Sequence, residues 1–398
     1  MTEVNQSPLL SIIIPTKNRQ HTCLYAIESG LLLNKTDIEI IIQDCSDSNK
    51  LEKQIIDKFG IDARINYEYT DTKPSMTENW NRAFERSKGL YKCGIGDDDA
   101  VLPSIYNITK WAKDNNIEAV GHSKKYSFFW PDFTARPEMA SKLLVINSNV
   151  SEKVKIFERN ELDELLKQQA TIPDSNYRKL PMVYHCLLAS SLIDNLIMKT
   201  GRFMDGTSLD VYTAISLGLI VNKFYVYEMP FTLPGACGAS NSNRITSKII
   251  KAHFTEFKNI VIDERIPEVY NETFTIAEST LKAFSNMNDV SYSKLLDLPH
   301  LYADLLSHSF NTKIVKDLYR LMYENKFSNK DYLKFSKLYF FKKIFDLKIN
   351  LKVFIKKILY NSKYIKNTVL KSKEKKYALY ESDNILEAIE ILKSRRIL

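Results

Sequence analysis

Three consecutive carboxylates, Asp97, Asp98 and Asp99, are the residues whose type and spacing point most directly to chemistry. Adjacent carboxylates repel one another unless a cation is present. Mg²⁺ and Mn²⁺ prefer oxygen ligands and commonly share their coordination with substrate phosphates. The alternative is a solvated acidic turn, which an arbitrary run of aspartates more often forms. Gly96 before the run, and a buried strand leading into it, favour a metal site over that alternative.

The elements that must position this triplet alternate between strands and helices over the first 120 or so residues. The apolar runs predict strands, and the helical spacing of apolar residues predicts helices between them. The strands are expected at 9–14, 37–43, 64–69 and 90–95, and the helices at 19–33, 49–59 and 77–88. Such alternation indicates a parallel sheet flanked by helices, with ligands beyond the carboxyl ends of its strands. The segments at Pro15, Asp44 and Asp97 all lie at those ends, so we expect them to converge.

The rest of the chain has a less regular pattern. Residues 130–180 are irregular apart from a helix near 159–168, and a mobile loop rich in Gly, Ser and Asn is expected at 230–244. Between them the pattern predicts helices at 183–199 and 207–218 and a strand at 219–227. Beyond residue 246 the signals are helical to the end. We therefore predict two units, 1–245 and 246–398, with an α/β first unit and an all-helical second one.

Charge is distributed unevenly along the 398 residues. The net charge is +8, but residues 330–398 hold 18 Lys or Arg and 7 Asp or Glu, which gives +11 there and −3 elsewhere. No apolar run approaches the roughly 20 residues of a membrane-spanning helix. The first residues do not resemble a secretory signal. With five scattered cysteines, this pattern favours reduced thiols in a cytoplasmic protein.

Three motifs in order resemble the family 2 glycosyltransferases over roughly residues 8–230. They are SIIIPTKNR at 11–19, IIQDCSDS around Asp44, and NWNRAFERSKGLYKCGIGDDDAVLP at 79–103. The first Asp of the family's Asp-x-Asp is replaced here by Gly96, a departure that the pattern GDDD tolerates. The resemblance implies a GT-A fold with a Rossmann-like mixed sheet. It also implies a nucleotide-diphosphate sugar donor and a divalent metal, Mn²⁺ or Mg²⁺.

The resemblance assigns roles to residues by their place in the motifs. Counting back from Pro103, Asp98 corresponds to the metal ligand, Asp97 to the residue near the ribose, and Asp99 to a neighbour that holds the loop. Asp44 corresponds to the residue that contacts the nucleobase. The substrate-binding set expected from these motifs is Pro15, Thr16, Arg19, Asp44, Asn81, Asp97 and Asp99.

Inverting transfer also requires a base to remove the proton of the acceptor hydroxyl. In the family this carboxylate lies at the start of a helix after a Gly-aromatic turn, and GRFMDGTSLDVYTAISLG at 201–218 resembles that segment. Asp210 occupies the corresponding position and is the expected catalytic base. The alternative is an Asp that only interacts favourably with the helix dipole. Asp205, beside Gly206, is interpreted as a turn residue.

Two further residues are candidates for substrate contacts. His185, in PMVYHCLLAS, falls where the acceptor side of such a site would lie, although a structural histidine is the alternative. Arg244 and the GACGASNSN stretch before it are candidates to donate hydrogen bonds to the leaving diphosphate. A plain surface loop is the alternative for that stretch.

The basic tail has a pattern typical of helices that lie on anionic membranes. Residues 337–360 interleave Lys with Phe, Ile, Leu and Tyr, so lysines can surround an apolar face. Nucleic-acid binding and an ordinary helix docked on its own domain are the alternatives. We expect a membrane surface and no nucleic acid as partner, with oligomer contacts through the C-terminal helices as a further option.

These features together predict an inverting, metal-dependent glycosyltransferase of surface-glycan synthesis. Its expected donor is a nucleotide sugar, with UDP favoured, and its expected acceptor is a saccharide or a lipid-linked saccharide. The expected location is the cytoplasm, peripherally on the membrane. The alternative is a catalytically inactive GT-A module tethered to a membrane or partner. A nucleotidyltransferase is disfavoured because PTKNR at 15–19 lacks the glycines of a phosphate loop.

Overall fold

Apolar strands near the start of the chain form the centre of a mixed sheet in this computed structural model. The model describes residues 7–123, 125–146, 153–240, 257, 261–269, 271–308, 312–360, 377–395 and 397. β1 (Leu10–Thr16) pairs in parallel with β2 (Ile38–Asp44) on one side and with β4 (Tyr91–Gly94) on the other. Every residue of these three strands is buried, as expected for parallel strands covered on both faces. β3 (Ile65–Tyr69) pairs in parallel with β2 at the edge.

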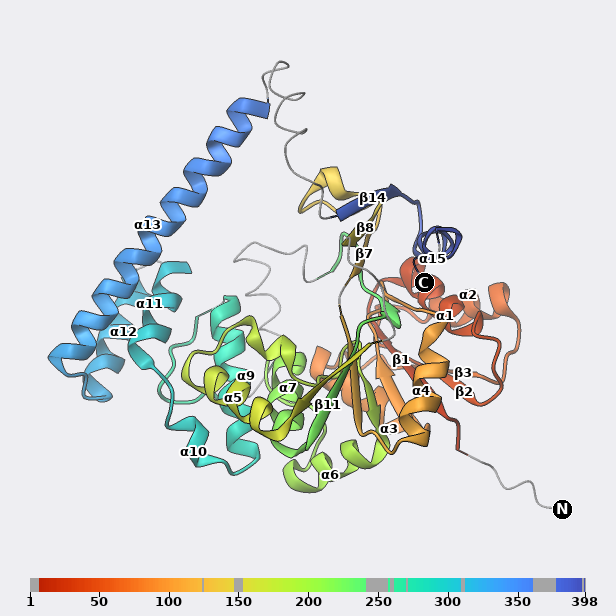
Figure 1. Ribbon diagram of the computed structural model, residues 1–398, viewed down its shortest axis with the longest axis horizontal. Coiled ribbons are helices and arrows are strands. Elements are labelled where there is room, and N and C mark those ends of the chain that lie inside the picture. Colours follow the sequence, from red (N-terminus) through yellow and green to blue (C-terminus); the bar gives the residue numbers. More distant parts are fainter. Residues whose placement is uncertain are drawn as a thin grey trace.

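The helices expected between these strands are present. They are α1 (Gln20–Leu31), α2 (Lys50–Phe59) and α3 (Met76–Arg86), and a further helix that was not expected, α4 (Ser104–Asp114), follows the triplet. In Figure 1, α1, α2 and α4 lie beside the red and orange strands of this half of the sheet. The predicted α/β class is confirmed for this part of the chain.

The second half of the sheet mixes strand directions. β10 (Leu187–Ala189) runs antiparallel between β4 and β6 (Ala119–His122). β11 (Lys223–Tyr227) is parallel to β6, and β9 (Val154–Glu158) closes the edge in the antiparallel direction. The order is β3-β2-β1-β4-β10-β6-β11-β9. Both β1 and β4 therefore end at the same edge, where the Asp triplet follows.

The helix predicted at 183–199 is wrong over its first part. The apolar run there contains β10, and the helix, α6 (Ser190–Thr200), begins only after it. His185 has a φ of 58°, which is incompatible with a right-handed helix. A short apolar run does not distinguish a buried strand from a buried helix by periodicity.

A second sheet brings three distant parts of the chain together. Its order is β13 (Gly235–Ala236), β7 (Tyr126–Phe129), β8 (Lys142–Ile146) and β14 (Tyr377–Glu381). Two of these strands lie in or beside the region expected to be irregular, and β14 lies in the region expected to be helical to the chain end. Both expectations are corrected here, because pairing with distant strands outweighs weak local patterns.

The last residues of the chain return to this second sheet. β14 pairs with β8, and α15 (Ile385–Ser394) follows it. Figure 1 shows β14 and α15, in blue, beside β8 and near the red α1. Apolar residues of α15 share one buried cluster with Tyr126, Phe128 and Trp130. The predicted division at residue 245 stays a prediction. Residues 377–395 and 397, however, pack with the first unit.

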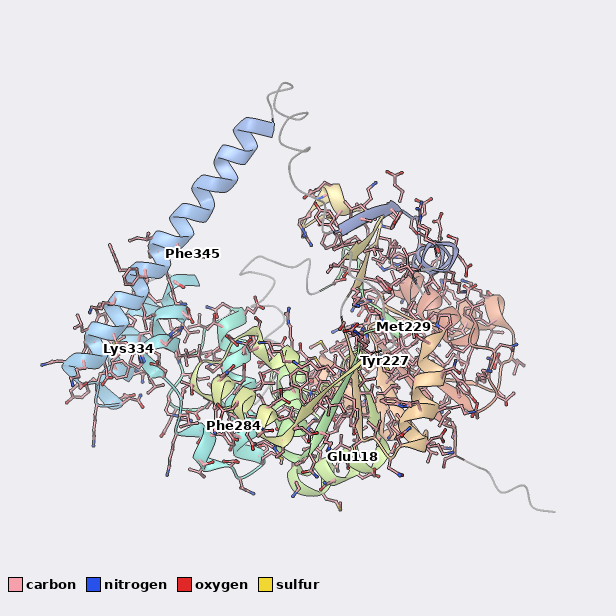
Figure 2. The ribbon with its side chains drawn as sticks, in the orientation of Figure 1. Glu118, Tyr227, Met229, Phe284, Lys334 and Phe345 are labelled. Atoms are coloured by element: carbon pink, nitrogen blue, oxygen red, sulfur yellow. The ribbon has the colours of Figure 1, made fainter. Side chains whose placement is uncertain are left out.

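The described residues 271–308 and 312–360 are mainly helical, as predicted, whereas residues 261–269 contain no helix. α5 (Arg159–Thr171) and α7 (Leu209–Ile220) pack with α9 (Glu272–Asn286) and the short α10 (Val290–Ser293). Phe284 of α9, labelled in Figure 2, stacks on Tyr292 of α10. α11 (Leu298–His308), α12 (Thr312–Glu324) and α13 (Asn329–Tyr360) follow around a separate apolar core. Within the described residues, no helix combines the length and the apolar character needed to cross a bilayer.

Candidate active site

A cleft of about 450 Å³ opens at the carboxyl ends of β1 and β4. It therefore lies where ligands bind in sheets of this kind. Of the sequence-predicted residues, Pro15, Thr16, Arg19, Asp98, Asp99 and His185 line it, together with Lys17, Asn18, Cys45, Asn79, Trp80, Tyr184, Gly235 and Ser240. The segments after β1, β2 and β4 thus converge, as the strand pattern predicts, with Cys45 representing the segment after β2. The segment around Gly235 joins them, which the strand pattern did not predict.

Asp97 is the most enclosed carboxylate of the triplet, with no exposed surface. It accepts a hydrogen bond from the Thr16 hydroxyl (2.7 Å) and forms an ion pair with Arg19 (3.1 Å). Burial raises the pKa of the Asp97 carboxyl to about 6, although the Arg19 guanidinium acts in the opposite direction. Asp97 therefore links the triplet to Thr16, the last residue of β1, and to Arg19.

Asp98 faces the cleft and is bonded through both carboxylate oxygens. Oδ1 lies 3.4 Å from an Arg19 nitrogen. Oδ2 accepts hydrogen bonds from the Cys237 N–H (3.1 Å) and from the Ser240 hydroxyl. Its backbone carbonyl accepts a bond from the Trp130 indole N–H (2.9 Å). Asp98 is thus the carboxylate that joins the end of the first sheet to the second sheet.

Asp99 holds the backbone around the triplet. It accepts hydrogen bonds from the N–H groups of Gly96 (2.6 Å) and Gly235 (2.7 Å). His185 Nε2 lies 3.5 Å from its Oδ2. Burial, with the charge of Asp98 next, raises the pKa of the Asp99 carboxyl well above its usual range. These contacts agree with the role of a neighbour that holds the loop.

The expectation of a mobile loop at 230–244 is corrected for its described part, up to residue 240. β12 (Thr232–Leu233) pairs with β5 (Ala100–Val101), and β13 pairs with β7. A Cβ on Gly235 would lie 1.7 Å from the Asp98 carbonyl oxygen, so the missing side chain permits a close approach that fixes this segment. Arg244 lies outside the described residues.

His185 belongs to a chain of polar groups that runs away from the triplet. Its Nδ1 lies 3.0 Å from the Thr232 hydroxyl, which also lies 2.6 Å from His122 Nε2. Nδ1 of His122 in turn lies 3.1 Å from the Ser123 carbonyl oxygen. The structural alternative for His185 is therefore supported by these contacts, while its cleft-lining position keeps it a candidate for substrate contact.

Besides the fully enclosed Asp97, two further predicted substrate-binding residues do not reach the cleft. Asp44 is fully buried, and its oxygens accept bonds from the Ser46 N–H (2.8 Å) and the Tyr67 hydroxyl (3.0 Å). The side-chain amide of Asn81 donates a hydrogen bond to the Met204 carbonyl and accepts one from the Met204 N–H. In this structure both side chains serve the scaffold, so a direct substrate contact by either stays a prediction.

The sequence reasoning missed several cleft residues. Asn79 is buried, donates to the Gln43 carbonyl (3.1 Å), and leaves Oδ1 without a hydrogen-bond partner among the described residues. It lay inside the quoted motif two positions before Asn81, so the motif was a usable signal. Ser240 lies within the GACGASNSN stretch that was a candidate for diphosphate contact. Its bond to Asp98, like that of Trp130, carried no such signal, because both contacts depend on the second sheet.

Asp210 lies in the first turn of α7, as the base assignment requires. Its carboxylate accepts hydrogen bonds from the Tyr177 hydroxyl (2.9 Å) and the Ser208 hydroxyl (2.5 Å). Tyr184, which lines the cleft, connects it electrostatically with the triplet. Burial, and then the charges of Asp210 and Asp99, raise the pKa of the Tyr184 phenol. Tyr184 is therefore close enough to both Asp210 and the triplet to be affected by their charges, although Asp210 itself does not line the cleft.

The donor set fits a divalent metal that takes most of its ligands from a nucleotide. The described residues contain no group of three or more metal-ligating side chains, so they offer no complete protein cage. Asp98 supplies a cleft-facing carboxylate, and Mg²⁺-type ions are often held by one or two carboxylates together with substrate phosphates. Oδ1 of Asp98 has Arg19 as its one contact among the described residues and so keeps a lone pair for such an ion, whereas both lone pairs of Oδ2 are used by the Cys237 N–H and the Ser240 hydroxyl.

Solved structures resemble this chain only distantly. TarS 1–349 from S. aureus, in complex with UDP-GlcNAc, is 12% identical with a TM-score of 0.44, covering 83% of this chain and 89% of that one. The mannosyltransferase PcManGT from Pyrobaculum calidifontis, in complex with GDP-Man and Mn²⁺, is 11% identical with a TM-score of 0.39. That match covers 86% of this chain and 87% of the other.

A nearer likeness is found in sequence. WcaA of Escherichia coli (strain K12), which bears the name of a colanic acid biosynthesis glycosyl transferase, is 35% identical over 106 residues. The match covers 26% of this chain and 38% of WcaA. The family model described as glycosyl transferase family 2 matches residues 11–167. This match includes the segment that carries Thr16, Arg19 and the Asp triplet, which is therefore similar to the family 2 glycosyl transferases.

Proposed function

We propose that this chain is an inverting, metal-dependent glycosyltransferase. It moves a sugar from a nucleotide-diphosphate donor, with UDP favoured, to a saccharide or lipid-linked saccharide during surface-glycan synthesis. The observation that carries the proposal is the position of Asp98. This carboxylate faces a cleft at the ends of β1 and β4, beside Arg19, within the segment that matches the family.

The donor half of the proposed site consists of the triplet and the segment after β1. Asp98 would hold Mn²⁺ or Mg²⁺, which neutralises charge on the leaving diphosphate when bound. Arg19 lies between Asp97 and Asp98, so it limits the repulsion between the two carboxylates. Pro15, Thr16 and Asn79 line the same half, and the acceptor-only Oδ1 of Asn79 suits a hydroxyl or N–H of the nucleotide sugar.

The acceptor half of the proposed site depends on Asp210. As the acceptor hydroxyl oxygen bonds to the anomeric carbon, Asp210 takes the hydroxyl proton. The bond between the anomeric carbon and the diphosphate oxygen breaks on the opposite side, so the configuration inverts. Tyr177 and Ser208 each donate one hydrogen bond to the carboxylate, which orients it and leaves further lone pairs for the proton.

A panel of nucleotide sugars tests this proposal. UDP-glucose, UDP-galactose, UDP-N-acetylglucosamine and GDP-mannose are each incubated with the protein and Mn²⁺, and the nucleotide released to water is measured. We expect release from at least one UDP-sugar, and its loss in EDTA and in Asp210→Asn. UDP binding without release from any donor would favour the inactive module instead.

We further propose peripheral contact with the cytoplasmic face of a membrane through α13. Phe340, Phe341 and Phe345 are exposed by 62%, 65% and 62%. Lys342 and Lys343 on the same turns contact Asp304 and the Ser307 carbonyl of α11, so α13 is also docked on its neighbour. Figure 2 labels Phe345 on this helix.

Vesicle binding tests the membrane contact. Deleting residues 330–398 would also remove β14 and α15, so substitution of the three exposed phenylalanines by serine is the cleaner variant. Full-length protein should sediment with anionic phosphatidylserine vesicles at low salt and be partly released by high salt, because the basic charge is screened. The triple variant should stay in solution. Wild-type protein that does not sediment would favour a helix that is only docked.

A further inference from the structure

The turn that precedes the proposed base is held by a helix outside the family match. Residues 205–208 lead into α7, and Gly206 there has a φ of 76°. A Cβ on Gly206 would lie 2.9 Å from the Ser279 hydroxyl of α9. The backbone of the turn therefore lies directly against α9, two to four residues before Asp210.

Glu278 of α9 binds this turn with a single carboxylate oxygen. Its Oε2 accepts hydrogen bonds from the Thr207 N–H (2.9 Å), the Thr207 hydroxyl (2.8 Å) and the Ser279 hydroxyl (2.9 Å). Glu278 is 2% exposed, and burial raises the pKa of its carboxyl. Its Oε1 has no hydrogen-bond partner among the described residues. Burial of a carboxyl group costs free energy unless the group is hydrogen-bonded. In Glu278 only one of the two oxygens is hydrogen-bonded among the described residues, and all of its bonds go to the turn or to Ser279.

The same face of α9 makes further contacts with the turn. Ser279 accepts a hydrogen bond from the Ser208 N–H (2.9 Å). Asn286 donates to Asp205 (2.9 Å). The first bond satisfies the N–H of Ser208, the residue that caps α7 and whose N–H has no partner within the helix. The second holds the Asp205 side chain against α9. The amides that set the direction of the first turn of α7 are therefore fixed by side chains of α9.

The opposite side of the turn is fixed by α3. The Thr77 hydroxyl donates to the Gly206 carbonyl (3.1 Å), and Asn81 bonds the Met204 backbone in both directions. The turn is thus clamped between α3, which belongs to the family segment, and α9, which does not. Rotation of the first turn of α7 would move Asp210, because that residue lies two positions after Ser208.

We propose that Glu278 and Ser279 are positioning residues for Asp210, and that α9 thereby forms part of the acceptor half of the site. This inference rests on the proposed function, since it requires Asp210 to be the base. Glu278 fixes the Thr207 amide and hydroxyl, Ser279 fixes the Ser208 amide, and together they hold the first turn of α7, which carries Asp210. A displacement of about 1 Å at a reacting group can lower a rate by around a hundredfold.

The test compares Glu278→Leu with Glu278→Gln. Leu removes the acceptor for Thr207, whereas Gln retains one acceptor oxygen of nearly the same shape. Thr280→Val is the matched control, because Thr280 is also fully buried on α9 but faces Gln169 of α5 (3.4 Å). The readouts are nucleotide release from the UDP-sugar that reacts fastest with wild-type protein, its KM, and UDP affinity with Mn²⁺.

We expect Glu278→Leu to lower kcat by about ten- to a hundredfold with KM and UDP affinity nearly unchanged, in line with a misplaced catalytic group. Glu278→Gln and Thr280→Val should stay within about threefold of wild type. Hydrogen exchange at the Thr207 and Ser208 amides should be faster in Glu278→Leu. An unchanged kcat despite faster exchange would overturn the inference, as would an equal loss in Thr280→Val.

A double variant separates positioning from general destabilisation. In the Asp210→Asn background, Glu278→Leu should cause no further loss of release, because residues that act through one another are not additive. A further loss of the same factor as in wild type would overturn the inference. A fully active Asp210→Asn protein would instead remove the base assignment in the proposed function, so the two failures are distinguishable.

Discussion

The two halves of the candidate site are held in place by different means. On the donor side, Asp97 and Asp98 follow β4 and are bonded to Arg19, to the Cys237 N–H just after β13, and to Ser240. On the acceptor side, Asp210 lies on a helix whose first turn is clamped by side chains of α3 and α9. The donor side thus depends on strand ends and backbone geometry, and the acceptor side on side-chain contacts between helices.

This difference teaches where each half is vulnerable. Backbone groups at strand ends tolerate most side-chain changes but not an added atom at a close approach, such as Gly235 against the Asp98 carbonyl. Contacts between helices can shift by small rotations, so single buried side chains such as Glu278 control the direction of Asp210. Changes on the donor side should therefore affect nucleotide binding, and changes on the acceptor side should affect turnover with binding intact.

The largest effect is expected on the acceptor side. Asp210→Asn retains the shape but not the proton acceptor, and general bases contribute about a hundred- to ten-thousandfold to rate. We expect loss of sugar transfer by a factor in that range, with UDP and Mn²⁺ binding unchanged by calorimetry. Asp205→Asn, in the same turn, is the control and should retain substantial activity. Loss of UDP binding in Asp210→Asn would contradict the assignment of nucleotide binding to the donor side and of turnover to the acceptor side.

A donor-side change at Gly235 should have the next largest effect. Gly235→Ala places a Cβ 1.7 Å from the Asp98 carbonyl oxygen, so β13 must move away from the triplet. We expect UDP affinity with Mn²⁺ to fall at least tenfold, measured by calorimetry.

The control for that change is Gly218→Ala on α7, where the nearest atoms are Leu side-chain carbons at 3.3 Å. Those carbons can yield slightly, and alanine favours a helix by up to about 1 kcal/mol over glycine. UDP affinity should therefore be unaffected in the control. An equal loss in both variants would show that close approach to Asp98 is not the cause.

The smallest effect concerns Ser240. Its hydroxyl donates to Oδ2 of Asp98, so Ser240→Ala frees a lone pair on the carboxylate proposed to hold the metal. We expect Mn²⁺ affinity in the presence of UDP to rise by about three- to tenfold, since a typical hydrogen bond makes a net contribution of about 0.5–1.5 kcal/mol. Electron paramagnetic resonance of free Mn²⁺ measures this. The control is Ser104→Ala, which loses only a bond to the Pro230 carbonyl (3.0 Å) and should leave the Mn²⁺ affinity unchanged. A weaker Mn²⁺ affinity in Ser240→Ala would contradict the prediction and show that Ser240 promotes metal binding.

The donor half of the site could be predicted from the sequence more directly than the acceptor half. The strands before the triplet could be predicted because β1, β2 and β4 are short, wholly buried apolar runs followed by polar turns. The convergence of Thr16, Arg19 and Asp98 followed from parallel pairing alone. Asp210 was found only through the resemblance of its segment to the family.

The parts that escaped prediction depend on long-range contacts. β10 was interpreted as helix because its apolar run has no distinctive period, and β14 because its partner, β8, lies more than 200 residues earlier. The contacts of Ser240 and Trp130 with Asp98 could not be predicted, since they arise from the second sheet. Glu278 carried no signal either, because a Glu within a helical pattern normally indicates an exposed position.

Calorimetry of UDP binding with Mn²⁺ or with EDTA, on wild-type protein, Asp98→Ala and Asp210→Asn, tests the central claim most directly. If Asp98 holds a metal for the diphosphate and Asp210 serves only the transfer step, wild type and Asp210→Asn bind UDP with Mn²⁺ and lose most of that affinity in EDTA. Asp98→Ala then binds weakly under both conditions while keeping its fold. Equal UDP affinity with Mn²⁺ and with EDTA in wild type, or Mn²⁺-dependent binding that survives in Asp98→Ala, would contradict the account.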